Sequence, residues 1–330
     1  MGKRKERRFK RLQAADTVQK KEKAKKASVQ EHKPSSSSFG GLEKFYWNEY
    51  KKLLWIPFII LFLAMAQIGY QISTTGSFVD KGITLKGGVT VTVPSDVPLD
   101  KDYLEGVLQE EFSSYDVVVR GLKSATGKAS GVIIDADITG DDVDPFVQLI
   151  ADTTLVSRQT FSVEEIGSSL GASFFKQTLS ALLMAFFFMG IVVFLYFRVF
   201  MPCFAVILAA FSDIVATLAV INILEVKLST AGIAAFLMLI GYSIDTDMLL
   251  SIKVLKKKDK SLKERIYSSM KTGLTMSCTT LAAVLTILLF SKSEILTQIA
   301  LIVFIGLLFD LIFTWIQNVG LLRIHVEGKQ

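Results

Sequence analysis

Residues 178–197 read TLSALLMAFFFMGIVVFLYF, a run without a single charged side chain. A helix needs about 20 mostly apolar residues to cross the hydrocarbon core of a bilayer. Further runs of this kind, with few charges, occur at residues 53–72, 202–223, 229–251, 274–291 and 295–317. The sequence therefore predicts a membrane protein with six transmembrane helices.

The composition of the whole chain agrees with this prediction. Of the 330 residues, 51% are hydrophobic and 21% are charged, and the mean hydropathy is +0.44. This balance is far more apolar than that of soluble domains. The two cysteines exclude a disulfide-built extracellular module.

Charged residues are distributed unevenly between the segments that flank the spans. Residues 1–52 hold 16 Lys and Arg against 6 Asp and Glu, and residues 253–271 hold 8 against 2. Residues 74–176 are the reverse, with 8 basic and 16 acidic side chains. Because basic residues are enriched in cytoplasmic segments, we expect a multi-pass protein of the cell (cytoplasmic) membrane with both termini in the cytoplasm.

These observations divide the chain into five expected parts. They are a basic cytoplasmic tail and linker over 1–52, a first transmembrane helix over 53–72, an extracytoplasmic domain over 73–177, transmembrane helices two to six over 178–323 with a cytoplasmic loop at 253–271, and a cytoplasmic tail over 324–330. The basic tail is expected to be attracted to anionic lipid, and contact with ribosomal RNA is the alternative.

The extracytoplasmic segment shows alternating strand and helix patterns. Strands are predicted at 83–93, with a bulge or bend at its paired glycines, and at 115–122, 131–137 and 159–165; helices are predicted at 100–112, with Asp100 as N-cap, and at 142–152. The order β-α-β-β-α-β is the ferredoxin-like pattern of one antiparallel sheet with two helices on one face. The predicted fold class is therefore a membrane all-α six-helix bundle with an α+β ferredoxin-like extracytoplasmic domain.

No motif in this domain indicates a metal, a cofactor or a catalytic site. Residues 135–140 resemble the start of a calcium loop, but Phe146 stands where that loop needs a bidentate Glu. A strand end followed by an Asp-rich helix N-terminus explains the acidic residues better. No pair of nucleophile and base can be assembled there, so we expect no enzymatic activity.

Four aspartates lie inside the predicted spans, namely Asp213, Asp245, Asp247 and Asp310. A carboxylate at bilayer depth is costly unless it is protonated, paired or beside water, so such residues are candidates for function. From a rise of ~1.5 Å per residue, Asp213 and Asp245 lie ~16 Å and ~12 Å from the cytoplasmic ends of their spans. Asp310 falls at a comparable or slightly greater depth.

Asp245 and Asp247 point about 200° apart around a helix, so they cannot face the same partner. Asp247 is nearer the cytoplasmic surface, where water can solvate it, whereas Asp245 lies beside Tyr242 and near Gly241. These positions favour Asp245 as the residue that faces the bundle centre.

The spans contain no Lys or Arg at this depth. The aspartates therefore need a proton, a cation on another subunit, or hydrogen bonds from polar side chains of the spans. The candidate hydrogen-bond partners are Ser212, Thr217, Thr230, Thr246, Thr279, Thr280 and Asn318. This requirement favours a proton relay or a partner-facing surface. The alternative is that protonated aspartates serve only as hydrogen-bonded glue between helices.

Several motifs resemble those of the SecD/SecF protein-export family, which is related to the resistance-nodulation-division transporters. Residues 82–88 (GITLKGG) resemble the family's strand after the first span, and residues 166–171 (IGSSLG) resemble its entry into the second. Residues 233–247 (IAAFLMLIGYSIDTD) resemble its Gly-Tyr-Ser-Ile-Asn-Asp segment, and residues 272–281 resemble its fifth-span threonine pattern. The resemblance covers nearly everything from Leu53 onward and is closest to the SecF side of the family.

One departure from the bacterial pattern points to the archaeal branch. Where the bacterial SecF segment has Asn-Asp, this chain has Asp245-Thr246-Asp247, so Asp245 aligns with the aspartate that the SecD half carries. The long charged tail is also similar to the archaeal proteins. Because of this departure, the residues of the bacterial proton path do not map directly onto this chain.

The resemblance implies an accessory subunit of the Sec translocase, which acts with a SecD-like subunit and a Sec channel of the SecY/SecE type on secreted polypeptides. It implies promotion of late translocation or release, coupled to the proton-motive force. The expected proton relay or intramembrane polar network comprises Asp213, Asp245, Asp247, Asp310, Tyr242, Thr279 and Thr280.

Other functions stay open on the sequence alone. A subunit of a small-solute or lipid exporter of the resistance-nodulation-division type would share the architecture, although the short outer loops leave little room for a substrate route. An intramembrane aspartyl protease is disfavoured, because residues 241–245 break the Gly-x-Gly-Asp pattern of such enzymes. A structural subunit without proton coupling also fits.

Overall fold

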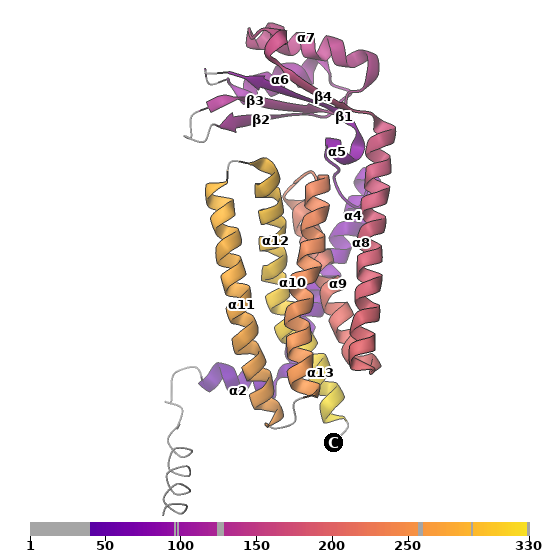
Figure 1. The fold of residues 1–330 in the computed structure, drawn as a ribbon, viewed down its shortest axis with the longest axis vertical. Coiled ribbons are helices and arrows are strands. Elements are labelled where there is room, and N and C mark those ends of the chain that lie inside the picture. The colour runs from indigo at the N-terminus through magenta and orange to yellow at the C-terminus, as the bar shows by residue number, and fades with distance from the viewer. Residues whose placement is uncertain are drawn as a thin grey trace, which may run out of the picture. The chain divides into compact units, whose positions relative to one another are not determined.

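The structure is a computed structural model that describes residues 40–95, 97, 99–123, 129–256, 260–291 and 293–328 (Figure 1). Most of the basic tail lies outside these described residues. The chain separates into two units, Met1–Tyr50 and Lys51–Gln330. In the first unit the described element is α2 (Gly40–Asn48), and α3 (Tyr50–Leu53) begins at the boundary.

Six helical segments of the described chain are long and apolar enough to cross a membrane, as predicted. They are built from α4 (Trp55–Thr75), α8 (Ser168–Phe197), α9 (Phe200–Ile223), α10 (Thr230–Leu255), α11 (Leu262–Phe290), and a last segment of α12 (Glu294–Ile312), η3 (Phe313–Asn318) and α13 (Val319–Glu327). The chain is therefore a multi-pass membrane protein.

Two helices extend well beyond the apolar runs that predicted them. Helix α8 begins at Ser168, and α11 begins at Leu262, so much of the segment expected as a cytoplasmic loop is helical. The start of α11 is fixed by a capping box, in which the Ser261 hydroxyl accepts from the Glu264 N–H and the Glu264 carboxylate accepts from the Ser261 N–H. Hydropathy detects only the part of a helix that lies in hydrocarbon, which explains the difference.

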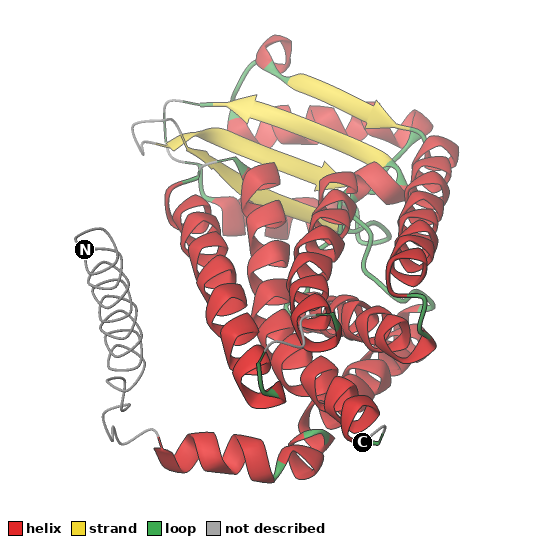
Figure 2. Cartoon of the chain, turned by 60° about the horizontal axis from the view of Figure 1, so that its bottom comes forward, coloured by secondary structure: helices red, strands yellow, loops and turns green. Residues whose placement is uncertain are grey.

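Helices α9, α10 and α12 form the centre of the bundle. Their apolar windows are 61%, 50% and 50% buried, compared with 11% for both α8 and α11, which lie at the outside. Helix α12 packs against both α9 and α10, α4 packs against α9, and α11 packs against α10 and α12. Figure 2 shows this bundle next to the sheet.

The segment between α4 and α8 folds into an antiparallel sheet with helices. Its main elements are β1 (Gly88–Pro94), α6 (Lys101–Glu111), β2 (Val117–Lys123), β3 (Ala129–Ala136), α7 (Val143–Thr154) and β4 (Ser162–Ile166). Their order along the chain is the predicted one. The strands lie in the order β2-β3-β1-β4, and all neighbouring pairs are antiparallel.

One face of this sheet forms the core of the folded segment between α4 and α8, which we call the outer domain. Val89, Val91 and Val93 of β1 are fully buried, because alternate side chains of a strand point to the same face. Helices α6 and α7 cover that face with apolar residues that include Leu108 and Phe146. Both helices lie on the side of the sheet away from the membrane helices (Figure 1).

The prediction of the first strand, over residues 83–93, is wrong in its first half. Residues Ile83–Lys86 form a single helical turn, α5, and the strand begins only at Gly88. Gly87 and Gly88 have φ angles of 91° and 140°, a backbone conformation that favours glycine and ends the turn. The turn inserts Leu85, which is 1% exposed, into the apolar cluster at the outer end of the membrane helices.

The α5 turn lies in direct backbone contact with the start of α8. A Cβ atom added to Gly171 would lie 2.5 Å from the Gly87 nitrogen and 2.9 Å from the Lys86 carbonyl carbon. Since both neighbours are backbone atoms, neither can move aside without shifting the outer domain relative to α8.

We predict that Gly171→Ala destabilises the protein by about 1–3 kcal/mol, the usual cost of overpacking. Thermal unfolding of the purified chain in detergent measures this loss. The matched control is Gly190→Ala on the same helix, where the added Cβ would meet one side-chain atom at 3.4 Å. Equal unfolding temperatures for the two variants would contradict the tight junction.

Candidate functional site

Three aspartates meet in the centre of the membrane bundle. Asp213 comes from α9, Asp247 from α10 and Asp310 from the end of α12, and each is at most 1% exposed. The surrounding polar side chains are also buried; they are Ser212, Ser243, Thr246, Thr314, Gln317 and Asn318. We call these nine residues the carboxyl cluster.

Hydrogen bonds within the cluster connect the central helices. The Ser243 hydroxyl donates to Asp213 Oδ2 at 2.6 Å and so joins α10 to α9. Asn318 Nδ2 donates to Asp247 Oδ1 at 2.7 Å. Thr246 lies 3.3 Å from Asp310 Oδ2, which connects α10 to α12.

The Thr314 hydroxyl lies between two of the carboxyl groups. Its oxygen is 2.8 Å from Asp247 Oδ1 and 2.9 Å from Asp310 Oδ1. A hydroxyl has one hydrogen and can donate it to one acceptor at a time. The second contact becomes a full hydrogen bond when that carboxyl group carries a proton and donates to the hydroxyl oxygen.

The backbone that supplies Thr314, Gln317 and Asn318 is a π-helix, η3. A π-helix is rare and occurs mostly as a short bulge inside an α-helix, frequently at functional sites. Here it turns three polar side chains toward the centre within six residues. The last membrane segment therefore presents its polar groups where its α-helical geometry is interrupted.

Within the described residues, no Lys or Arg forms an ion pair with Asp213, Asp247 or Asp310. Two carboxyl oxygens, Asp213 Oδ1 and Asp247 Oδ2, are buried and have no hydrogen-bond partner among the same residues. Charged carboxylates in such a place are strongly disfavoured. The cluster can therefore accept protons at oxygens that hold no other hydrogen bond.

The expectation that Asp245 faces the bundle centre is wrong. Asp247 lies there, and Asp245 is exposed on the outer surface of α10. Tyr242 is also exposed, at 37%. Thr279 is exposed, and the Thr279 and Thr280 hydroxyls both donate to the carbonyl of Met276 within α11. Of the seven predicted residues, the structure thus brings together Asp213, Asp247 and Asp310.

Most of the exposed residues of α10 form one narrow stripe along the helix. Ala234, Met238, Gly241, Tyr242 and Asp245 follow each other at helical spacing, and all are exposed. We call this set the α10 stripe. It combines small residues, which allow close helix packing, with a carboxyl group that hydrocarbon would not solvate.

The connection between α9 and α10 is attached to the outer domain. Leu228 N donates to the Asp80 carbonyl at 2.7 Å, and Gly82 N donates to the Leu228 carbonyl at 2.8 Å. Lys227 forms an ion pair with Asp116, which directly precedes β2. The two helices that carry Asp213 and Asp247 are therefore joined to the outer domain through their own short loop.

We predict that Asp247→Ala destabilises the isolated chain by about 1–3 kcal/mol, because Asn318 Nδ2 loses its acceptor in a buried site. Asp245→Ala should change the stability by less than about 0.5 kcal/mol, since Asp245 is exposed. Thermal unfolding in detergent compares the two. A larger loss for Asp245→Ala would contradict the placement of the two residues.

Comparison with known proteins gives one consistent family. Residues 147–327, more than half of the chain, match the family described as protein export membrane protein SecD/SecF, C-terminal. The chain is 38% identical to the protein-export membrane protein SecF of Pyrococcus furiosus, over 85% of this chain and 93% of that protein. It is 36% identical to SecF of Methanocaldococcus jannaschii, over 84% of this chain and 96% of that protein.

A solved structure has a similar fold. The crystal structure of SecDF, a translocon-associated membrane protein from a Thermus species, matches 85% of this chain with a TM-score of 0.66 and 19% identity. This chain spans only 38% of that SecDF chain. The family match and the similarity to the archaeal relatives, together with six spans around one outer domain, show that the chain belongs to the SecD/SecF family of protein-export membrane proteins.

Proposed function

We propose that this protein is the SecF-type subunit of a protein-export complex. It acts with a SecD-like subunit beside a Sec channel of the SecY/SecE type and promotes the late translocation or release of secreted polypeptides. The identity to proteins named SecF over more than four fifths of the chain supports this role. In this role the chain would help to move a polypeptide and would not catalyse a covalent reaction.

The carboxyl cluster is the observation that carries the proposed mechanism. Three buried carboxyl groups on three helices, bridged by hydroxyl and amide groups, are poised to take up and release protons. Removing a proton from one carboxyl group changes which groups can donate to Thr314 and Ser243. The export cycle would couple to the proton-motive force through this exchange.

The loop between α9 and α10 would transmit movement at the carboxyl cluster to the outer domain. A shift of α9 against α10 displaces their connecting loop, and that loop is hydrogen-bonded to residues 80–82 and paired with Asp116 by Lys227. The outer domain would then change its position at the membrane surface. A part that moves in this way can hold or release an emerging polypeptide.

The organisation of the chain follows from the same proposal. We infer that the outer domain, over residues 73–177, is ferredoxin-like; the sheet order β2-β3-β1-β4 with two helices on one face supports this assignment. We infer that residues 1–52, 253–271 and 324–330 lie in the cytoplasm, because their excess of basic residues favours that side. The outer domain would then face the exported chain.

The α10 stripe is the surface that we propose for the SecD-like subunit. An exposed carboxyl group at about the middle of a span costs about 2.5–3.5 kcal/mol in lipid. A partner helix that packs on Gly241 and supplies a cation or a hydrogen-bond donor to Asp245 would remove this cost. The carboxyl cluster, by contrast, is buried within the chain and hydrogen-bonded to the chain's own side chains.

We predict that Asp213→Asn with Asp247→Asn slows the release of a secreted reporter at least about tenfold, the effect of removing a group that makes the proton transfer. Pulse-chase labelling in cells that depend on this chain measures the rate. A protonophore should slow release in cells with the wild-type chain and add no further effect in cells with the double variant.

Asp102→Asn is the matched control, because Asp102 is an exposed carboxylate of the outer domain. It should leave release unchanged. An unchanged release rate in the double variant, with normal assembly into the complex, would remove the proton-relay role. Poor assembly of the double variant would instead favour the view that the aspartates are structural glue.

We predict that Gly241→Leu lowers recovery of a SecD-like subunit at least about fivefold when the chain is purified through a carboxyl-terminal tag. A side chain at Gly241 would meet nothing within this chain, so the isolated protein should fold normally. Gly69→Leu on α4 is the control, since Gly69 is equally open. Mass spectrometry identifies the co-purifying subunits.

Recovery of a second six-span protein and of Sec channel subunits with the wild-type chain supports the export role. Recovery of the chain alone, or as a homotrimer, would favour an exporter of small solutes or lipids and would contradict the proposal. If Gly241→Leu and Gly69→Leu reduce recovery equally, the partner does not bind at the α10 stripe.

A further inference from the structure

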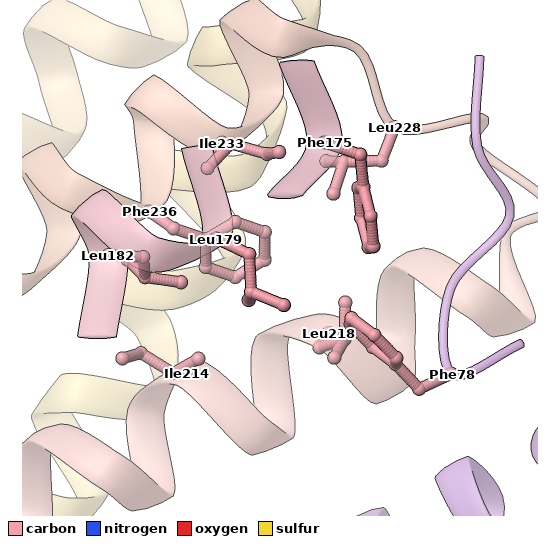
Figure 3. Close-up of a pocket in the computed structure, with 9 residues that line it drawn as sticks. All are labelled: Phe78, Phe175, Leu179, Leu182, Ile214, Leu218, Leu228, Ile233 and Phe236. Atoms are coloured by element: carbon pink, nitrogen blue, oxygen red, sulfur yellow. The ribbon is translucent and has the colours of Figure 1, made fainter. Parts of the chain in front are cut away.

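An apolar cavity lies between the outer ends of α8, α9 and α10 (Figure 3). Phe175, Leu179 and Leu182 line it from α8, Ile214 and Leu218 from α9, and Phe236 from α10. The remaining walls are also apolar. Its volume is about 360 Å³ when the open space at its mouth is included, so it is a shallow recess between the helices.

The cavity offers nothing that would hold water. All its lining side chains are hydrocarbon or aromatic, and a buried water needs two to four polar partners. Most of these side chains are only partly buried, so the space is open to its surroundings. In a bilayer those surroundings are hydrocarbon chains. The chemistry of the walls therefore selects an alkyl chain as occupant.

The length of the cavity along α8 is comparable to part of a lipid's hydrocarbon chain. From Phe175 to Leu182 the wall extends ~10 Å along α8, at a rise of ~1.5 Å per residue. One leaflet of the hydrocarbon core is about 15 Å thick, half of the ~30 Å core. The lining residue Phe78 belongs to the segment between α4 and the outer domain, and Leu228 belongs to the loop between α9 and α10. The cavity therefore reaches the outer surface of the bundle.

The ammonium group of Lys81 lies beside the outer end of the cavity. The Lys81 ammonium group is 4.2 Å from the centre of the Phe175 ring, and Phe175 in turn packs against Phe78 with ring centres 5.8 Å apart. Lys81 makes no ion pair with any of the residues that the structure describes. An ammonium group that has no carboxylate partner among the described residues, next to an apolar cavity, matches a molecule with an anionic head and a hydrocarbon tail.

We propose that this cavity binds one hydrocarbon chain of an anionic membrane lipid whose phosphate group lies on Lys81. The lipid chain packs between α8 and the α9–α10 pair, and its head lies next to residues 80–82, where the outer domain meets the membrane helices. Bound there, the lipid adds contacts across the junction between α8 and the α9–α10 loop. This inference does not depend on protein export.

Native mass spectrometry of the full chain, purified in detergent, tests the proposal. Dipalmitoyl phosphatidylglycerol and dipalmitoyl phosphatidylcholine are the probes, because they share their chains and differ in head-group charge. We expect one phosphatidylglycerol molecule to be retained, about fivefold more tightly than phosphatidylcholine, which is the effect of one lysine near an anionic group.

Variants separate the head-group contact from the chain contact. Lys81→Ala should abolish the preference for phosphatidylglycerol, whereas Lys176→Ala, an exposed lysine on α8, should keep it. Leu179→Trp should fill the cavity and lower lipid retention at least about fivefold. Leu183→Trp, one turn further along α8 at a residue that is 64% exposed, should not.

Leu218→Trp fills the cavity from α9 and replaces Leu179→Trp if that variant does not fold. The proposal is overturned if folded cavity-filling variants retain the lipid as the wild-type chain does. It is also overturned if the wild-type chain retains both lipids equally, or if Lys81→Ala keeps the preference for phosphatidylglycerol.

Discussion

Burying three carboxyl groups in a membrane without a cation is the constraint on which this structure depends. Among the residues that the structure describes, Asp213, Asp247 and Asp310 are joined only to hydroxyl and amide groups of the central helices. Such groups can satisfy protonated carboxyl groups but cannot neutralise carboxylates. Two features of the fold bring hydrogen-bond donors to these carboxyl groups. They are the packing of α9, α10 and α12 and the π-helix at Phe313–Asn318.

The position of the cluster explains why the two halves of the protein can act together. The helices that supply Asp213 and Asp247 are consecutive, and the loop between them is hydrogen-bonded to the segment that enters the outer domain. A second junction lies at Gly87 and Gly171, where backbone meets backbone and no side chain can adapt. The outer domain is therefore attached to the bundle at two rigid contacts, and the apolar cavity lies between the helices that make them.

Charge and hydropathy in the sequence were enough to predict the six spans and the order of strands and helices in the outer domain. They failed at the α5 turn, because the alternation of residues 83–93 continues through two glycines whose positive φ angles end the pattern. The same sequence signals also favoured Asp245 over Asp247 as the aspartate that faces the bundle centre, and this was wrong. A membrane helix is apolar on every side, so hydropathy does not reveal its buried face.

A different signal in the sequence could have found the buried face of α10. Ser243, Asp247 and Ser251 recur every four residues, with Thr246 beside them, and all four are buried. In a span, polar residues at helical spacing indicate a polar neighbour within the bundle. Asn318 was among the predicted hydrogen-bond partners of the aspartates, and the structure confirms it. Thr314 was beyond such reasoning, because the π-helix that orients it changes the periodicity.

The most direct test of the proposed proton exchange is infrared difference spectroscopy of the complex in lipid bilayers as the pH is changed. The account predicts a carbonyl stretching band of protonated carboxyl groups that changes with pH and is lost or shifted in Asp247→Asn. A band that is insensitive to pH, or one that Asp247→Asn leaves unchanged, would contradict it.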